Sequence, residues 1–375
     1  MQNIEITKLI LENFRNFKTK TLTFSSRLVL FSGKNGVGKT NILEALTLFG
    51  KNQNLRGIDF DEMLATNYES QEKQQSFSLF CEISNHDFIE KIGISYNQNG
   101  KKNLLINGEN VASKKNSDTK NWLPNFIWLT PQLELLLISG KSGRREFLDK
   151  IVGDIDFSHN ARVNNYQKSL KERLLILQKT QNHNQEKWLE IVESKIAELG
   201  TSIALARNEA VEFFNKAINS FESNFPKSQL KIIDEISLCG AQNNALQIEE
   251  LYKTRLKTNR QIDKESFKTN FGVHRSDFSA IFLDKNSAAN YASTGEQKSI
   301  MIGIILARAK ISASYKNQPT ILIFDEIMSH LDEKKKFDLL DEVKRTNLQC
   351  FFSATSSALI PQSFLDKNLI QIVEV

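Results

Sequence analysis

The sequence is poor in the features that mark secreted, zinc-binding and membrane-spanning proteins. Only three of its 375 residues are cysteines, Cys81, Cys239 and Cys350. No two of them form a C-x-x-C pair, which argues against a cysteine metal site and for a reducing compartment. No apolar run approaches the roughly 18 residues that a membrane span needs, and the first residues lack the layout of a signal peptide. We therefore expect a cytoplasmic protein with no membrane partner.

The sequence also has little excess charge of either sign. Its formal net charge is +5, a mild basic bias that is compatible with nucleic acid as a partner but does not establish one. It contains neither an internal repeat nor a low-complexity tract. A chain of this length is long for one hydrophobic core, so we expect two lobes.

One glycine-rich stretch carries the strongest signal in the chain. Residues 33–40 read GKNGVGKT and fit the P-loop pattern G-x-x-x-x-G-K-[ST]. An apolar run at 28–31 precedes the stretch and a helical pattern at 41–49 follows it, which is the strand, loop and helix context of a phosphate site. The glycines let backbone N–H groups curl around phosphate, and the helix N-terminus favours the same anion. The predicted nucleotide-binding residues are Gly33, Lys34, Asn35, Gly36, Val37, Gly38, Lys39 and Thr40.

Two of these side chains have further predicted roles, and an acidic pair completes the site. Lys39 would reach the terminal phosphates of ATP, and the Thr40 hydroxyl would ligate Mg²⁺. Asp325 and Glu326 directly follow an apolar run at 320–324, where a parallel strand would end beside the P-loop strand. Asp325 would hold the metal through water, and Glu326 would orient or deprotonate the attacking water. We therefore predict Glu326 and Lys39 as catalytic residues, and Thr40 and Asp325 as metal ligands.

A third stretch, STGEQK at 293–298, begins a buried helix predicted at 297–310. A Ser-Thr-Gly-Glu run alone is a helix capping box. This stretch lies between the P-loop and the acidic pair, and its serine and glycine at a helix N-terminus match an ABC signature loop. The serine and the helix N-terminus of such a loop bind a γ-phosphate. In such ATPases this loop meets the P-loop of another subunit, so the order predicts a dimer that closes over two nucleotides.

The remaining patterns predict an α/β fold with mixed sheets and an inserted, mostly helical lobe. Alternating and apolar runs predict strands, and apolar steps of three and four over 155–222 predict two antiparallel helices with a polar turn at 178–186. Gly200 lies inside the second helix and predicts a kink. The predicted strands are 4–12, 21–31, 77–83, 88–96, 103–107, 126–130, 320–324 and 350–352. The predicted domains are an ATPase lobe (1–130 and 270–375), a helical lobe (131–240) and a connecting segment (241–269).

Several stretches together resemble the RecF family of recombination-mediator ATPases, which are related to SMC proteins. Besides the P-loop, the signature loop and the acidic pair, they lie at 11–17, 106–108, 140–149, 166–173 and 272–278, so the resemblance covers nearly the whole chain. It implies an ABC/SMC-type P-loop ATPase head with a short helical lobe in place of a coiled coil. It also implies ATP and Mg²⁺ as cofactors, an ATP-dependent homodimer, and a weak DNA-stimulated ATPase that acts as a switch.

The resemblance further implies a place in recombinational repair and replication restart. Its members bind DNA at gaps, where single and double strands meet, and work with RecO and RecR to load recombinase. The two alternatives are an ABC transporter-type ATPase subunit and a small-molecule P-loop kinase. A transporter subunit would have a shorter spacing from P-loop to signature loop and a switch histidine, and this sequence has neither. A small-molecule kinase would leave residues 293–295 unexplained.

The resemblance also assigns finer roles. Ser293, Gly295 and Gln297 would contact the γ-phosphate held by the partner copy, and Gln132 would sense Mg²⁺ from a Q-loop. Asp332 falls at the D-loop position, and Thr355 falls at the switch position, where ABC ATPases usually carry histidine. Arg56 lies in a loop that contacts nucleotide in relatives, but it is equally interpreted as a solvated loop arginine. Candidate ligands for DNA phosphates are Lys141, Arg144, Arg145 and Arg275, each of which is equally a partner for a nearby acid (Glu146, Asp149 or Asp277).

Overall fold

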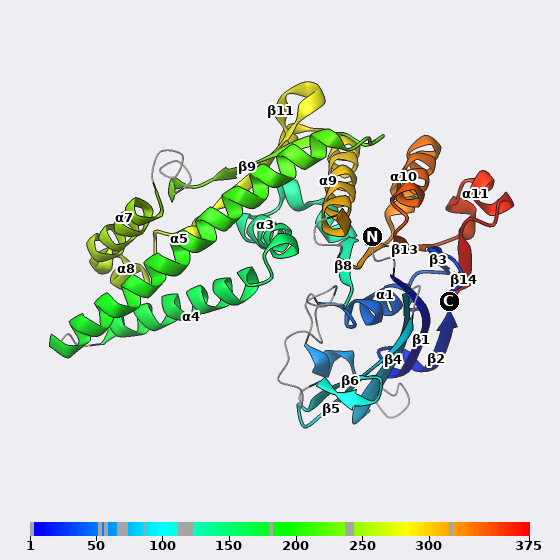
Figure 1. Cartoon of the computed structure of the whole chain (residues 1–375), viewed down its shortest axis with the longest axis horizontal. Helices are drawn as coiled ribbons and strands as arrows, with labels where there is room; N and C mark the ends of the chain where they lie inside the picture. The colour runs from blue at the N-terminus through cyan, green and yellow to red at the C-terminus, as the bar shows by residue number, and fades with distance from the viewer. Residues whose placement is uncertain are drawn as a thin grey trace. The chain divides into compact units, whose positions relative to one another are not determined.

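The computed structural model (Figure 1) divides the chain into two compact units. Unit 1 comprises Met1–Glu134, Ser223–Phe225 and Ile305–Val375, and unit 2 comprises Leu135–Glu222 and Pro226–Ile304. The structure describes residues 4–51, 55, 59–65, 74–85, 88–111, 123–179, 183–236, 244–314 and 318–375.

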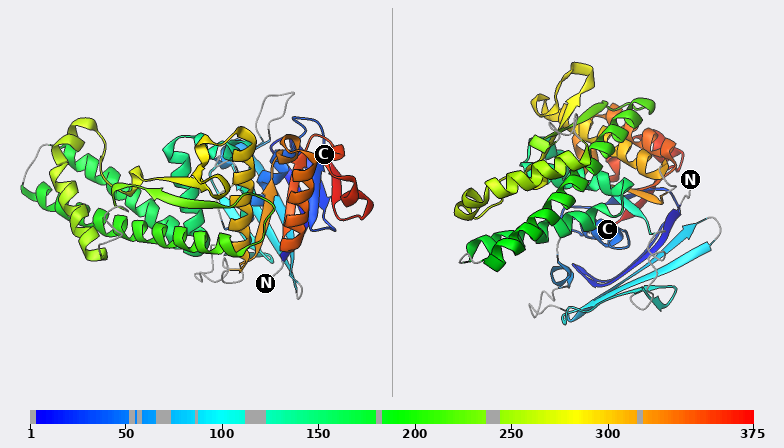
Figure 2. Two further views of the ribbon diagram at one scale, coloured as in Figure 1. Left: turned by 90° about the horizontal axis from the view of Figure 1, so that it is seen from above. Right: turned by 60° about the vertical axis from the view of Figure 1, so that its left-hand side comes forward.

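Unit 1 contains an antiparallel sheet of order β2-β1-β4-β5-β6-β7. Its longest strands, β1, β4 and β5, lie side by side (Figures 1 and 2). Buried and more exposed residues alternate along β1 and β4, as expected for a sheet with one face on the core. The strands are β1 (Ile4–Phe14), β2 (Phe17–Thr23), β4 (Ser76–Asn85), β5 (Phe88–Asn97), β6 (Lys102–Ile106) and β7 (Glu109–Asn110).

A second sheet of unit 1 is entirely parallel, with the order β14-β3-β13-β12-β8. Its inner strands are mostly apolar and buried along their whole length, which is the pattern of a parallel strand covered on both faces. The strands are β3 (Leu28–Ser32), β8 (Asn125–Leu129), β12 (Thr320–Phe324), β13 (Gln349–Ala354) and β14 (Gln371–Glu374). The helices of this part are α1 (Lys39–Thr47), α2 (Pro131–Glu134), α10 (Glu333–Thr346) and α11 (Gln362–Asp366).

One hydrophobic cluster joins the two sheets and α1. It contains Leu9 of β1, Phe77 of β4, Leu43 of α1, Phe31 of β3 and Phe351 of β13. The predicted strand at 21–31 is wrong as a single element: β2 ends at Thr23 and β3 begins at Leu28. The polar residues between them turn the chain from one sheet to the other, and the side chain of Gln371 accepts a hydrogen bond from the backbone N of Ser25 there.

Unit 2 is built on a helical hairpin and a small antiparallel sheet of order β11-β10-β9. Trp188 of α5 donates to Glu172 of α4 at 3.0 Å, and Gln185 donates to the carbonyl of Ile176 at 2.7 Å, which confirms the predicted pairing of the two helices. The elements are α3 (Lys141–Ile155), α4 (His159–Gln178), α5 (His183–Ser220), β9 (Ser228–Ile233), α7 (Ala245–Thr258), α8 (Arg260–Ser266), β10 (Asp277–Phe282) and β11 (Ser287–Ala288). Helix α9 (Thr294–Ser314) begins in unit 2 and ends in unit 1.

A buried arginine ties these helices together. Arg173 of α4 is 0 % exposed and donates to Glu193 of α5 at 2.9 Å and to Asp263 of α8 at 2.7 Å. The same guanidinium also donates to the hydroxyl of Thr269 and the carbonyl of Leu256. A buried charge is tolerated when its partners are charged and its donors are satisfied, so this cluster holds α4, α5 and α8 in one arrangement.

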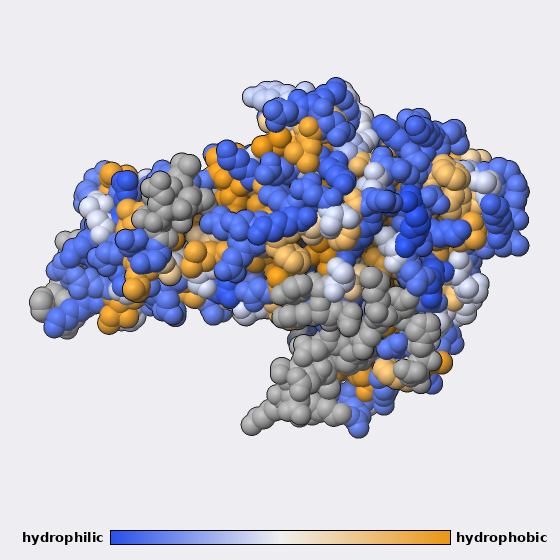
Figure 3. All heavy atoms as spheres, turned by 45° about the horizontal axis from the view of Figure 1, so that its top comes forward, coloured by the Kyte–Doolittle hydropathy of each residue, from blue (hydrophilic) through white to orange (hydrophobic). Residues whose placement is uncertain are grey.

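The two units divide the chain at Glu134 and Ile305, whereas the predicted lobes divide it at 130 and 270. Helices α7 and α8 form within the predicted connecting segment at 241–269, and Ile248, Tyr252 and Leu256 belong to a core of unit 2. The predicted assignment of domains stays a prediction. Among the described residues, every helix is too short or too polar to span a bilayer, and hydrophilic residues are interspersed with hydrophobic ones on the face drawn in Figure 3.

Gly200 marks a close contact inside an unbroken helix. Helix α5 continues through Gly200 as one element, so the glycine does not end the helix. A Cβ at this position would lie 2.5 Å from the ring of Tyr252, which is fully buried. The absence of a side chain at Gly200 therefore lets α7 approach α5.

Replacing Gly200 by alanine tests this contact. Alanine in a helix is normally favoured over glycine by about 1 kcal/mol, but overpacking a core costs about 1–3 kcal/mol. We expect Gly200→Ala to lower the free energy of unfolding, measured by urea denaturation. The matched control is Gly153→Ala in α3, where the new Cβ would meet its nearest atom at an ordinary 3.6 Å and should stabilise the protein. Equal stability of the two variants would contradict the packing role.

Candidate nucleotide-binding site

The P-loop lies between β3 and α1 and is shaped by glycines that other residues cannot replace. Gly36 and Gly38 have φ angles of 86° and 109°, which L-amino acids avoid. A Cβ on Gly38 would also lie 2.6 Å from the side chains of Asn16 and Phe17. The loop thus has a backbone conformation suited to wrapping an anion, as the glycine pattern predicts.

Lys39 occupies the inside of this loop. Its ammonium donates to the carbonyls of Gly33 at 2.7 Å and Lys34 at 2.9 Å, and the residue is only 4 % exposed. An ammonium has three protons to donate, so the bonds to the two carbonyls hold it at the mouth of the loop with capacity for a phosphate oxygen. The predicted contact of Lys39 with the terminal phosphates stays a prediction.

The turn between β1 and β2 supports the loop from outside. Asn16 donates to the carbonyl of Val37 at 2.9 Å and accepts from Asn41 of α1 at 2.8 Å. Arg15 forms a bidentate pair with Glu44 of α1, whose side chain is fully buried, at 2.9 and 3.0 Å. This role of Asn16 was missed from the sequence, where the polar and aromatic turn at 13–17 was the only available signal.

The acidic pair lies at the carboxyl end of β12, between β8 and β13. The Asp325 carboxylate accepts a hydrogen bond from the Thr40 hydroxyl at 3.2 Å, and the residue is 5 % exposed. The two predicted metal ligands are therefore neighbours, although 285 residues separate them in the sequence. Carboxylate and hydroxyl oxygens are the donors that Mg²⁺ prefers, so the residues present fit that ion.

Ser353 of β13 contacts both acids of the predicted pair and was not predicted from the sequence. Its hydroxyl donates to Asp325 Oδ1 at 2.6 Å and accepts from the backbone N of Glu326 at 2.9 Å. Glu326 is half-buried and has a left-handed φ of 57°, so the backbone turns away from the direction of β12 at this residue. The available signal was a serine inside the otherwise apolar run 350–354.

The finer predicted positions are distributed around this site. Thr355 follows β13 and is exposed, two residues beyond Ser353. Gln132 is exposed on α2, directly after β8, and Asp332 caps α10 by accepting from the backbone N of Lys335 at 2.8 Å. Arg56 lies outside the described residues. The roles of Thr355, Gln132 and Asp332 remain predictions.

The signature stretch belongs to unit 2 and has the geometry of a capped helix start. Both the backbone N and the hydroxyl of Ser293 donate to Glu296 at 2.9 Å. The hydrogen bond from Lys285, followed by those from Ser293, lowers the pKa of Glu296 to about 2. Gln297 is 6 % exposed and donates to the carbonyls of Asn290 and Ala292, so in this conformation it supports the loop from within. Space is open around Gly295.

The four candidate DNA contacts separate into two groups. Arg144 forms a bidentate pair with Asp277, with both distances 2.7 Å, and this hydrogen bonding raises the pKa of Arg144. Burial alone would raise the pKa of Asp277, but the bonds from Arg144 outweigh it and lower that pKa. Arg144 therefore forms an ion pair within the protein, which is the alternative to a DNA contact that the sequence left open. Lys141, Arg145 and Arg275 instead line a pocket of unit 2.

The P-loop after a parallel strand, the acid at the end of β12 and the adjoining antiparallel sheet define an ATPase head of the ABC/SMC class. Residues 5–374 match the family described as RecF/RecN/SMC N terminal domain. The chain is 35 % identical to the DNA replication and repair protein RecF of Rickettsia prowazekii (strain Madrid E) over 95 % of both chains. It is 34 % identical to that of Rickettsia canadensis (strain McKiel), over 99 % and 100 % of the two chains. The chain belongs to the RecF family.

Solved structures agree on the fold. The structure of the recombination mediator protein RecF-ATPrS in the RecFOR pathway superimposes with a TM-score of 0.82 at 24 % identity, over 96 % of this chain and 95 % of that one. The Smc head domain with an extended coiled coil from Pyrococcus furiosus gives a TM-score of 0.51 at 16 % identity, over 95 % and 91 %. The predicted ABC/SMC-type head with mixed sheets is confirmed.

Removing the Ser353 hydroxyl tests how the acidic pair is held. In Ser353→Ala the buried Asp325 loses a donor and the backbone N of Glu326 loses its acceptor. We expect ATP affinity in the presence of Mg²⁺ to fall about tenfold, the equivalent of one hydrogen bond to a charged group. Affinity measured in EDTA should hardly change. The exposed Thr355→Ala is the matched control, and identical titrations of the two variants with Mg²⁺-ATP would refute the role of Ser353.

Proposed function

We propose that this protein is an ATP-switched DNA-binding protein of recombinational repair and replication restart. The observation that carries the proposal is the meeting of Thr40, Asp325 and Ser353 beside the P-loop, within a chain of the RecF family. Its relatives are named DNA replication and repair proteins, and one solved neighbour is described as a recombination mediator with ATP. The full-length similarity to RecF favours this proposal over a transporter subunit or a small-molecule kinase.

In this proposal the residues of unit 1 bind and position the nucleotide. Backbone N–H groups of residues 33–40 surround the phosphates, and Lys39 keeps its two carbonyl partners and donates its third proton to a phosphate oxygen. Thr40 and Asp325 would hold Mg²⁺, which would supply positive charge that neutralises the phosphates. Glu326, turned out of β12 by its left-handed backbone, orients the attacking water and accepts its proton.

The second half of each site comes from another copy of the chain. Ser293 and the open backbone at Gly295 lie at the start of α9, where a helix N-terminus favours an anion. Binding the partner's γ-phosphate would release the Ser293 hydroxyl from Glu296, while Gln297 keeps the loop in shape. Threonine rather than histidine at 355 supports slow hydrolysis, so ATP works as a timer of dimer closure.

DNA and two further proteins complete the proposal. The family resemblance and the basic bias support single-stranded and gapped duplex DNA as the partner, bound through its backbone. The description of solved relatives as part of a RecFOR pathway supports RecO-like and RecR-like proteins as helpers in loading recombinase.

Sedimentation of the Glu326→Gln protein tests the ATP switch. Without its water-orienting carboxylate the protein should bind ATP, fail to hydrolyse it, and accumulate as a dimer in ATP and Mg²⁺ but not in ADP. Ser293→Arg added to this variant should keep nucleotide binding and abolish the dimer. Ser314→Arg, exposed at the other end of the same helix, is the matched control and should dimerise normally. A Glu326→Gln protein that stays monomeric with ATP and Mg²⁺ would reject the composite site.

A further inference from the structure

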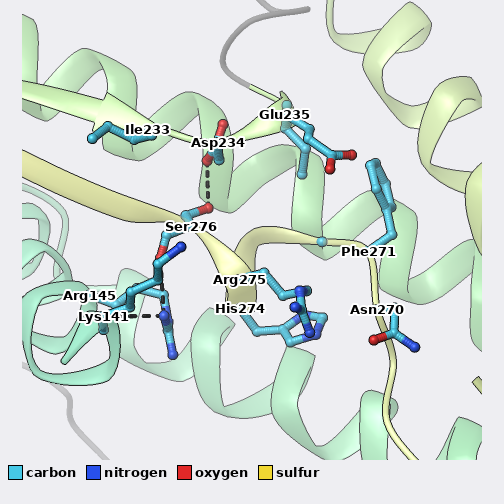
Figure 4. Close-up of a pocket in the computed structure, with 12 residues that line it drawn as sticks. Lys141, Arg145, Ile233, Asp234, Glu235, Asn270, Phe271, His274, Arg275 and Ser276 are labelled. Atoms are coloured by element: carbon cyan, nitrogen blue, oxygen red, sulfur yellow. Dashed lines mark hydrogen bonds between the residues drawn. The ribbon is translucent and has the colours of Figure 1, made fainter. Parts of the chain in front are cut away.

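Unit 2 contains a pocket whose lining residues differ from those of the nucleotide site. Its volume is about 490 Å³, and three segments line it: the start of α3, the end of β9 and the loop at 270–276. Figure 4 shows Lys141 and Arg145 projecting from α3, His274 and Arg275 on the loop that leads to β10, and Asp234 and Glu235 on the opposite wall. None of the lining residues belongs to the P-loop, the acidic pair or the signature loop.

The basic side chains of this pocket form no direct ion pair with the acids around them. Among the residues that the structure describes, no carboxylate lies within ion-pair distance of Lys141, Arg145 or Arg275. The nearby acids have other partners: Arg144 holds Asp277, and Arg207 and His159 hold Asp149. Burial, followed by the neighbouring guanidinium of Arg207, lowers the pKa of Arg145, and the more distant carboxylates of Asp149 and Asp277 offset this only in part.

Hydrogen bonds hold two side chains of the pocket, Arg145 and His274, in position before any ligand arrives. Arg145 donates to the carbonyls of Ser276 at 3.0 Å and Lys141 at 3.3 Å, which links α3 to the loop. His274 is fixed between the Tyr166 hydroxyl at 2.9 Å and the Thr269 carbonyl at 2.8 Å. Burial is the main cause that lowers the pKa of His274, so its ring is neutral near pH 7 and serves as a support.

The backbone next to Arg275 is equally constrained. The backbone N of Val273 donates to the Tyr252 hydroxyl at 2.8 Å, and its carbonyl accepts from Arg207 at 2.7 Å. Gly272 has a φ of 136°, and a Cβ there would lie 2.6 Å from the same Tyr252 hydroxyl. A rigid loop therefore presents Arg275, which reduces the entropy lost when the side chain binds a ligand.

The acidic wall restricts what the pocket accepts. Asp234 accepts from the Ser276 hydroxyl, and Glu235 is exposed at the rim. A compact polyanion that filled the whole pocket would meet these carboxylates. A chain with single, spaced negative charges can follow the basic wall alone, and a nucleic-acid backbone has this form.

We propose that Lys141, Arg145 and Arg275 bind consecutive phosphodiesters of one DNA strand. The arginines supply planar forks that match phosphate oxygens, and Lys141 supplies a point charge at the exposed start of α3. The contacts carry no base readout and set only the position and direction of the strand. The inference rests on the proposed DNA-binding function and adds the surface of unit 2 that contacts the strand.

The test compares two charge-matched double variants of the full chain on a gapped duplex. Lys141→Gln/Arg275→Gln removes the two exposed pocket cations. The control Lys195→Gln/Arg255→Gln removes one exposed lysine and one exposed arginine of the same unit that do not line the pocket. In fluorescence anisotropy titrations the pocket variant should bind DNA about tenfold more weakly and lose about two from the slope of log K against log salt. The control should follow the wild type, and ATP affinity should be the same in all three.

A neutral backbone supplies the second measurement. Single methylphosphonate substitutions scanned along the strand should weaken wild-type binding at the contacted phosphates and leave the pocket variant unaffected at those positions. If the wild type binds DNA and the pocket variant matches the control in affinity and salt slope, the pocket is not the phosphate site. If the wild type itself shows no salt-dependent DNA binding, the proposed function fails instead.

Discussion

The structure depends on a carboxylate that is buried at the end of a parallel strand. Asp325 is 5 % exposed and accepts hydrogen bonds from the hydroxyls of Thr40 and Ser353. Thr40 lies in the helix after β3, and Ser353 lies in β13, so both donors come from other strands of the same sheet or the segment after them. A buried charge is costly unless it is paired, and two hydroxyl donors do not neutralise it. The site is therefore built to gain from a cation, and the parallel order β3-β13-β12 brings together the P-loop, the serine and the acid that would hold it.

The parts of the fold predicted from the sequence are those in which a local pattern decides the structure. The apolar runs that became β12 and β13 are found as predicted, as are the alternating runs of β1, β4 and β5 and the helical steps of α4 and α5, whereas the predicted strand at 21–31 divides into β2 and β3. The P-loop was predictable because its glycines are required by its own backbone. The acid after β12 was predictable because parallel strands end at one edge of the sheet.

The parts that the sequence left open depend on contacts between distant residues. Ser353 is one serine in an apolar strand, and only the pairing of β13 with β12 places it against Asp325. Asn16 reaches the P-loop from a turn whose composition shows no partner. Gly200 was interpreted as a kink because its real reason, the ring of Tyr252, comes from a helix that was itself predicted as a connecting segment. The three cations of the pocket in unit 2 were all singled out from the sequence, but only the structure separates them from Arg144.

The central claim is that each nucleotide site is shared by two copies of the chain, and mixing two defective proteins tests it directly. Lys39→Ala lacks a working P-loop but keeps its signature loop, and Ser293→Arg has the opposite defect. Neither protein should hydrolyse ATP alone, and an equimolar mixture should regain turnover, because the mixed dimer has one complete site. A Ser293→Arg protein that hydrolyses ATP at the wild-type rate by itself, with no gain on mixing, would rule out a shared site.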